Sequence, residues 1–313
     1  MPFKAKVVLT NPVEMRRLSP VVDVDGLITE AQHDAGRDLD RRGTGELVAL
    51  MNRLDASVPG AVAVAEDAIA QVIDRIVDRL EAGGRLVYVG AGSSGRQAVA
   101  DAAECEGTFS TPPSQVVAVF AGESDSAEDD AEAGSRALQS LAVGEADAVV
   151  GVSASGRTPY VLAALESAAA AGAFTACIVS TPGSPLGRLV DREIAVIVGP
   201  EAIAGSTRLK AGTAQKLVLN TISTVSMIRL GKVFDNLMVD VSAANEKLRA
   251  RARRIVEQVA GVGADEADAA LAAAGGSAKV AIVCLVAGLD RAAATERLDA
   301  AGGDLRAALE EPA

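Results

Sequence analysis

The chain has 313 residues and a formal net charge of −12, because Asp and Glu outnumber Lys and Arg by 42 to 30. Such an acidic chain without a basic cluster argues against binding of nucleic acid or of an anionic membrane surface. Apolar residues make up 49% of the chain and aromatic residues only 2%, so the core must be built from Ala, Val, Leu and Ile, as in helices packed on a parallel sheet.

The cysteines and the single histidine form no metal-binding or disulfide pattern. Cys105, Cys177 and Cys284 are widely spaced, and His33 is the only histidine. An odd cysteine count of this kind indicates a reducing compartment and argues against zinc. The N-terminus has no signal-peptide pattern, and no apolar run approaches the roughly 20 residues of a membrane span. We therefore expect a soluble cytoplasmic protein with no metal site.

The pattern of residues 1–84 predicts an N-terminal arm followed by two helices. Residues 1–43 contain three prolines and a charged run, and we expect them to form an N-terminal arm with little structure of its own. A helix is predicted from Thr44, which can cap it, to Leu54. Apolar residues then recur at helical spacing over residues 61–80, and Gly83–Gly84 end that second helix.

The next stretch predicts a strand, a turn rich in Gly and Ser, and a helix. Ser93 and Ser94 follow an apolar run, and good helix formers begin at Arg96. A helix that starts near Gly95 would point its free N–H groups and positive dipole end into the turn, where the serine hydroxyls add donors. Such a turn suits a compact phosphate monoester. By itself it fits equally well a turn whose serines only cap the helix.

The same alternation of strand and helix continues along the chain. Further apolar runs that fit strands lie at residues 116–120, 148–152, 173–179 and 194–198. Five strands that alternate with helices predict an α/β domain of three layers, with a five-stranded parallel sheet between helices. Ligands of such sheets bind at the carboxyl ends of the strands. The turns that follow the first and third predicted strands should therefore lie at one edge.

A second serine-lined turn follows the third predicted strand. Its candidate phosphate-binding residues are Ser153, Ser155, Gly156 and Thr158. Thr158 also suits the N-cap of the helix that follows. Two such turns at one sheet edge favour a phosphate-ester site over a pair of structural caps. Arg96 and Arg157 each follow a turn glycine, and they either bind phosphate as planar forks or form ion pairs that brace the turns.

Several longer runs resemble one enzyme family. They cover residues 90–96, 101–105, 151–160 and 205–220, and 236–248 adds a further match. Together they resemble the N-acetylmuramic acid 6-phosphate etherases, which contain a sugar isomerase (SIS) domain. The resemblance implies an SIS domain over residues 44–248 and a small all-α, ubiquitin-associated-like module of three helices over 249–313. It also implies a homodimer that uses no metal or nucleotide cofactor.

The resemblance implies a reaction and two catalytic residues. Enzymes of this family cleave the D-lactyl ether of N-acetylmuramic acid 6-phosphate to N-acetylglucosamine 6-phosphate and D-lactate, in peptidoglycan recycling. Glu104 and Glu128 match the family's two catalytic glutamates. Glu104 would protonate the departing lactate, and Glu128 would handle the C2 proton. The alanines around Glu104 would also desolvate it and favour its protonated form, although its spacing fits an exposed carboxylate at a helix end.

Three segments depart from the family pattern. Glu106–Gly107 replace a Pro-Pro pair, and residues 27–42 replace an Asn-Pro-Asn segment. The acidic loop 122–130 is several residues shorter than usual, so Glu123 is the alternative to Glu128. These segments leave open which ether or acyl substituent the site accepts.

Two other functions would use the same phosphate turns. A phosphosugar isomerase commonly needs a histidine to open the sugar ring, whereas His33 precedes the predicted domain core. A non-catalytic sugar-phosphate sensor would resemble the glucokinase regulatory protein, which carries two SIS domains, and this chain has room for one. The sequence therefore favours the etherase.

Overall fold

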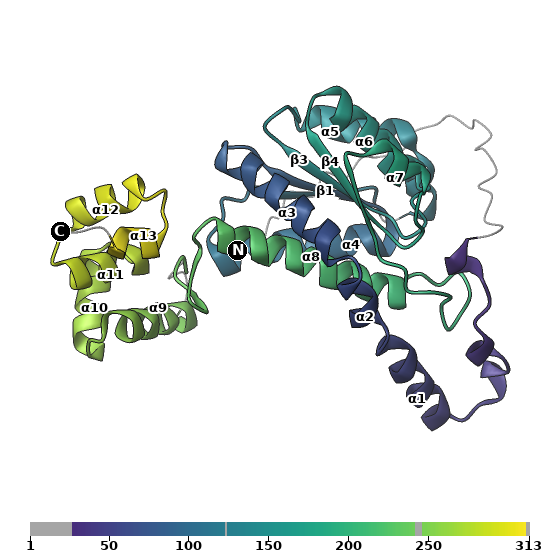
Figure 1. The fold of residues 1–313 in the computed structure, drawn as a ribbon, viewed down its shortest axis with the longest axis horizontal. Coiled ribbons are helices and arrows are strands. Elements are labelled where there is room, and N and C mark those ends of the chain that lie inside the picture. Colours follow the sequence, from purple (N-terminus) through teal and green to yellow (C-terminus); the bar gives the residue numbers. More distant parts are fainter. Residues whose placement is uncertain (1–26, 123, 242–245, 311–313) are drawn as a thin grey trace. The chain divides into compact units, whose positions relative to one another are not determined.

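The computed structural model describes residues 27–122, 124–241 and 246–310 (Figure 1). Contacts between residues divide the chain into two compact units. The first unit holds the chain up to Ala103 together with Pro113–Ser223, and the second holds Glu104–Pro112 together with the chain from Thr224 onward. Each unit has its own apolar core.

The first unit is built on a five-stranded sheet. Its strands are β1 (Leu86–Gly90), β2 (Val116–Phe120), β3 (Ala148–Val152), β4 (Phe174–Val179) and β5 (Arg192–Ala195). They lie in the order β2-β1-β3-β4-β5, and every neighbouring pair is parallel. All residues of β1, β3 and β4 are buried, as expected for strands covered by helices on both faces. The predicted five-stranded parallel sheet is confirmed, with β5 two residues earlier than expected.

Helices cover both faces of this sheet. The helices from Thr44 to Arg229 are α1 (Thr44–Asp55), α2 (Val58–Ala63), α3 (Glu66–Glu81), α4 (Gly92–Phe109), α5 (Ala131–Ser140), α6 (Pro159–Ala170), α7 (Pro185–Leu189) and α8 (Lys210–Arg229), of which α1 and α2 extend away from the sheet. Figure 1 shows α5 and α6 on one face and α3 on the other. The apolar stripe of α3, which includes Ile69, Val72 and Ile76, is fully buried. Packing of this stripe on the sheet removes its apolar side chains from water.

Part of the expected N-terminal arm is packed against the first unit. Residues 27–41 form three short 3₁₀ turns, Ile28–Glu30, Asp34–Gly36 and Leu39–Arg41. Thr29 is only 1% exposed, and its carbonyl accepts a hydrogen bond from the Gly205 N–H at 2.9 Å. This part of the chain therefore has a defined place, unlike the loosely structured arm that its composition suggested.

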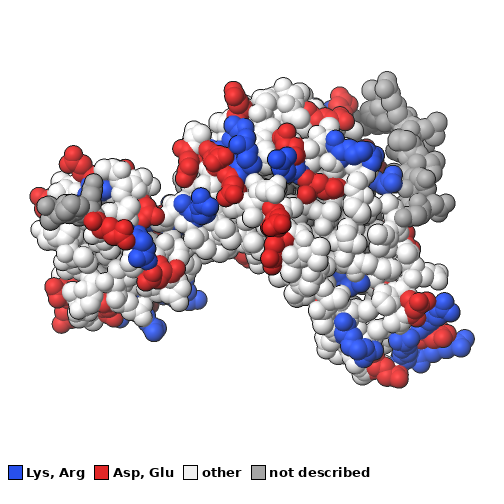
Figure 2. All heavy atoms as spheres, viewed as in Figure 1, with Lys and Arg blue, Asp and Glu red and all other residues white. Residues whose placement is uncertain are grey.

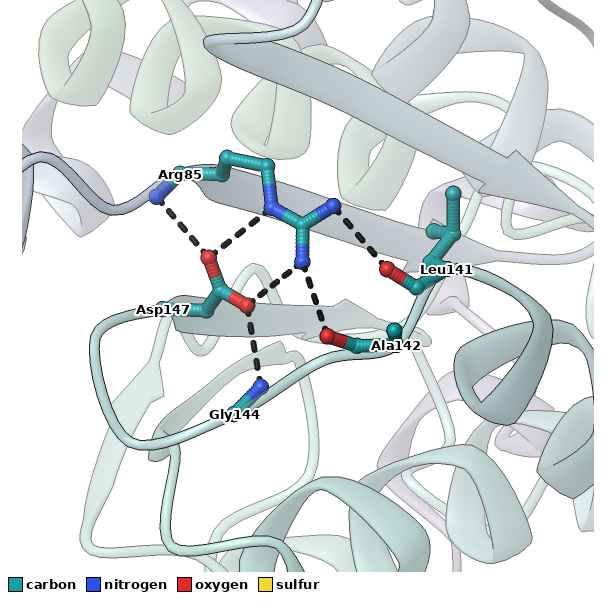
Figure 3. Close-up of polar contacts among 5 residues, drawn as sticks. All are labelled: Arg85, Leu141, Ala142, Gly144 and Asp147. Atoms are coloured by element: carbon teal, nitrogen blue, oxygen red, sulfur yellow. Dashed lines mark hydrogen bonds and ion pairs between the residues drawn. The ribbon is translucent and has the colours of Figure 1, made fainter.

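An ion pair holds the strand ends opposite the serine turns (Figure 3). The Asp147 carboxylate accepts hydrogen bonds from the backbone N–H, Nε and Nη2 of Arg85 at 3.0, 2.9 and 2.7 Å, and from the Gly144 N–H at 3.0 Å. Arg85 also donates to the carbonyls of Leu141 and Ala142. Burial raises the pKa of Asp147, but these hydrogen bonds and the Arg85 charge outweigh it and hold the pKa below its usual value.

We expect Asp147→Asn to lower the free energy of unfolding by about 1.5–3 kcal/mol at neutral pH, because it removes charged hydrogen bonds at a buried site. The lowered pKa of Asp147 means that this stabilisation is present above the unfolded pKa of about 3.9. It is lost as the pH falls through the lower folded value. Urea unfolding at pH 7 and at pH 3 measures both effects. A difference between the two proteins that is unchanged at pH 3 would contradict this account.

The second unit joins a hairpin to a group of helices. The hairpin is β6 (Val233–Phe234) with β7 (Leu237–Met238), and the helices are α9 (Glu246–Ala260), α10 (Ala264–Ala273), α11 (Ala278–Ala287), α12 (Arg291–Ala300) and α13 (Leu305–Glu310). The described residues of 246–310 thus form five helices, whereas the family resemblance implied a module of three. Val239 and Val241 share an apolar core with these helices. The contacts divide the units after Ser223, whereas the predicted domain boundary lies between residues 248 and 249.

Charges are mixed on the face drawn in Figure 2, where acidic and basic side chains lie side by side. Two of the basic residues before α1 pair with acidic neighbours, Arg37 with Asp34 and Arg41 with Asp38. Within the described ranges, no single helix combines the length and apolarity needed to cross a membrane. Two groups of helices joined at a bend meet those criteria by length and composition only. One group joins α1 and α2 to α3, and the other joins α10 to α11.

Candidate active site

The first serine turn is the beginning of a helix. Helix α4 begins at Gly92, one turn earlier than the predicted start near Gly95. Gly92 has a φ of +52°, a conformation that glycine adopts without the steric cost of a side chain. The chain therefore passes from β1 directly into α4. Ser93 and Ser94 lie in the first helical turn, where backbone N–H groups have no helical acceptor and favour an anion.

Gly95 serves close packing in this turn. A Cβ atom at this position would lie 2.7 Å from the Gly90 carbonyl oxygen and would collide with the ring of Phe120. Gly95 is not one of the residues that line the cavity described below. Its contribution among the described residues is to let α4 approach β1 and β2.

The second serine turn is held by its own hydroxyl groups. The hydroxyls of Ser153 and Thr158 share a hydrogen bond of 2.9 Å, and Ser153 Oγ also accepts from the Gly156 N–H at 3.1 Å. Ser155 Oγ accepts from the Arg157 N–H at 3.2 Å. Thr158 precedes α6, as predicted, but its side chain makes no capping hydrogen bond to that helix. Its hydroxyl pairs with Ser153 instead, which keeps the turn closed.

Gly156→Ala tests whether this turn conformation matters. Gly156 has a φ of +63°, and a Cβ atom there would meet the Ser184 side chain. An L-residue in the left-handed region costs about 1–2 kcal/mol, so we expect the variant to unfold more readily and to bind a sugar phosphate more weakly. Thermal unfolding and calorimetric titration measure the two effects. Gly144→Ala, at an open position, is the matched control; equal behaviour of the two variants would contradict the prediction.

The two turns line one cavity of about 330 Å³ in the first unit. They lie together because β1 and β3 are neighbours in register, with Gly90 opposite Val152 at their ends. The predicted residues that line the cavity are Ser93, Ser94, Ser153, Ser155, Thr158 and Glu128. A Cβ atom on Gly92 would lie 3.9 Å from Glu128 Oε2. The cavity therefore places a carboxylate next to the serine-bearing helix start.

Four further polar residues line the cavity and were missed by the sequence analysis. They are Thr29, Glu30, Asp129 and Thr207. Glu30 comes from the segment that was expected to be a loose arm. Its carboxylate lies at the 205–207 turn, since a Cβ atom on Gly205 would be 2.6 Å from Glu30 Oε2. Thr207 belongs to the most specific of the matching runs and could have been found there, whereas Glu30 had no periodic pattern to reveal it.

The two candidate arginines differ in position. Arg157 lines the cavity, and its Nε is buried without a hydrogen-bond partner among the described residues. The structure thus puts Arg157, of the two arginines, at the cavity. Arg96 does not line the cavity, and its guanidinium lies 5.8 Å from the centre of the Phe120 ring.

Glu104 lies where the second unit begins, on α4, and it is not one of the residues that line the cavity. Its side chain is exposed, so the expectation that neighbouring alanines desolvate it is wrong. Cys105, the next residue, is buried instead. The alternative residue Glu123 lies outside the described residues. No group of three or more His, Cys, Asp or Glu side chains in the described ranges could hold a metal ion.

The parallel α/β unit with its two hydroxyl-lined turns is an SIS domain, as two family models show. Residues 68–169 match the glucokinase regulatory protein N-terminal SIS domain, and residues 128–224 match the SIS domain. A solved phosphoheptose isomerase from Francisella tularensis is 18% identical, covering 60% of this chain and all of that one with a TM-score of 0.48.

Two relatives are much more similar to this chain in sequence. An N-acetylmuramic acid 6-phosphate etherase from Rubrobacter xylanophilus is 56% identical over 91% of this chain and 96% of its own. One from Streptomyces avermitilis is 49% identical over 92% of this chain and 94% of its own. The chain belongs to the N-acetylmuramic acid 6-phosphate etherase family.

Proposed function

We propose that this protein cleaves the D-lactyl ether of N-acetylmuramic acid 6-phosphate and releases N-acetylglucosamine 6-phosphate and D-lactate. The observation that carries the proposal is the cavity in which both serine turns, Arg157 and Glu128 meet. Hydroxyls, helix-start N–H groups and a guanidinium suit a phosphate group, and a carboxylate beside them can act on the attached sugar. Membership of the etherase family supports the same substrate.

The chemistry needs one base and one acid. In the open-chain sugar, the C1 aldehyde makes the C2 proton acidic. Removal of that proton, with cleavage of the C3–O bond and protonation of the lactyl oxygen, forms a C2=C3 double bond and frees lactate. Water then adds its oxygen to C3 and a proton to C2, which restores the sugar. General acid–base catalysis of this kind needs no redox cofactor.

The two glutamates take these roles in the proposal. Glu128 lines the cavity with the serine turns, and we assign it the C2 proton. Glu104 matches the family's acid in the run 101–105, and we assign it the proton given to the lactyl oxygen. Arg157, Ser93, Ser94, Ser155 and Thr158 would hold the phosphate.

The direct test is to incubate the purified protein with N-acetylmuramic acid 6-phosphate and to assay D-lactate. Release of D-lactate together with N-acetylglucosamine 6-phosphate is the expected result. Unphosphorylated N-acetylmuramic acid is the matched control and should react far more slowly, because the serine turns would have no phosphate to bind. Binding without lactate release would support a sensor instead, and aldose–ketose conversion would support an isomerase. Either outcome would overturn the proposal.

Two further properties are proposals from the family resemblance. We expect a homodimer and a cytoplasmic location, in which the enzyme recycles amino sugars from the peptidoglycan. Sedimentation equilibrium of the purified chain measures the first, and fractionation of the source cells measures the second.

A further inference from the structure

The hydroxyl groups of the cavity differ in the protons they can offer to a ligand. A serine or threonine hydroxyl has one proton to donate. The Ser155 hydroxyl accepts a hydrogen bond from the Arg157 N–H, so its own proton stays available. Ser153 and Thr158 have two hydroxyl protons between them, and the hydrogen bond that joins them uses one. Ser94 donates its proton to Gln215 Oε1 at 2.9 Å. In that arrangement Ser94 has no proton for a phosphate oxygen.

Gln215 is a buried residue of α8 outside the cavity lining. Its side chain is 2% exposed, and its Nε2 is buried with no hydrogen-bond partner in the described part of the chain. A buried amide donor without an acceptor is costly. The oxygen and nitrogen of an amide are nearly equal in size, so a half-turn about the last side-chain bond exchanges them. After this half-turn, one proton of Nε2 is donated to Ser94 Oγ, and Oε1 takes the buried position that has no partner in the described part of the chain.

We infer that Gln215 is a positioning residue that sets the direction of the Ser94 hydroxyl. With an anion in the cavity, Gln215 Nε2 donates to Ser94 Oγ, and Ser94 donates its own proton to an oxygen of the anion. Gln215 thus acts on the ligand only through Ser94. The inference rests on the proposed function only in that the cavity takes a phosphate group.

A double-mutant cycle tests this inference. The variants are Gln215→Met, Ser94→Ala and the two combined, and the probe is N-acetylglucosamine 6-phosphate in a calorimetric titration. We expect each single variant to weaken binding by about 10–100-fold, as for a lost hydrogen bond to a charged group. The double variant should bind no more weakly than Ser94→Ala alone, because Gln215 has no effect once the hydroxyl is gone. Additive losses would overturn the inference.

Two further variants separate this role from general damage to α8. Thr213→Ala changes an exposed residue of the same helix that bonds only to the Leu209 carbonyl, and it should bind the probe like the wild type. Gln215→Glu keeps an acceptor for the Ser94 proton but cannot donate when ionised, so it should bind at least as weakly as Gln215→Met. Wild-type affinity in Gln215→Glu would overturn the inference even if Gln215→Met fails to fold.

The outcomes also separate this inference from the proposed function. A wild-type protein that binds the probe through Ser94 but releases no D-lactate would refute the etherase proposal alone, and the cycle would still decide the role of Gln215. A wild-type protein that releases D-lactate but does not bind the probe through Ser94 would overturn the inference alone.

Discussion

Glu128→Ala is expected to lose both C2 proton exchange and D-lactate release, each by about 10²–10⁴-fold, the usual contribution of a general acid or base. Glu128 shares the cavity with the serine turns, so removing its carboxylate removes the base for the first step. No later step can proceed without that step. The measurement is incubation with substrate in heavy water, following deuterium at C2 and lactate separately.

Glu104→Ala is expected to lose D-lactate release but to retain exchange of the C2 proton. If Glu104 protonates the lactyl oxygen, its loss should reduce lactate release by a similar factor, about 10²–10⁴, while deuterium still enters C2. Glu106→Ala is the matched control, because it removes another exposed carboxylate of α4 that is not among the residues lining the cavity and should retain both readouts.

Glu123→Ala decides between the two alignments of the acidic loop. If this variant loses exchange while Glu128→Ala retains it, the base has been assigned to the wrong glutamate. If Glu104→Ala, Glu123→Ala and Glu128→Ala all release lactate at the wild-type rate, the mechanism with paired carboxylates does not apply to this protein.

The variant Ser94→Ala/Ser155→Ala should bind sugar phosphate about 10²–10⁴-fold more weakly than the wild type. Each lost hydrogen bond to a charged oxygen costs about 1.5–3 kcal/mol. The two hydroxyls come from different turns that line one cavity, so both should contact the same phosphate group. Ser140→Ala, an exposed position on α5, is the control. Calorimetric titration with N-acetylglucosamine 6-phosphate gives the affinities, and wild-type affinity in the double variant would remove the phosphate site from this cavity.

The sequence alone determined that the chain forms a parallel sheet and that the two serine turns lie at the same edge of it. The runs that form β1 to β5 are short, apolar and separated by helical periodicity, and this pattern admits few arrangements besides a parallel sheet. Neighbouring parallel strands end at the same edge. Ser94 and Ser155 could therefore be placed in one site without coordinates, and the longer matching runs identified the family.

Other features depended on contacts between segments far apart in the chain. Glu30 reaches the cavity because the backbone of Thr29 bonds to Gly205, and a backbone contact leaves no side-chain pattern to read. The exposure of Glu104 depends on which face of α4 packs inward, which its alanine-rich surroundings do not specify. The partnership of Ser94 with Gln215 joins residues 121 positions apart, and local sequence carries no information about such a contact. Only the tertiary structure decided these features, because long-range packing and hydrogen bonding select among conformations that local propensities leave nearly equal.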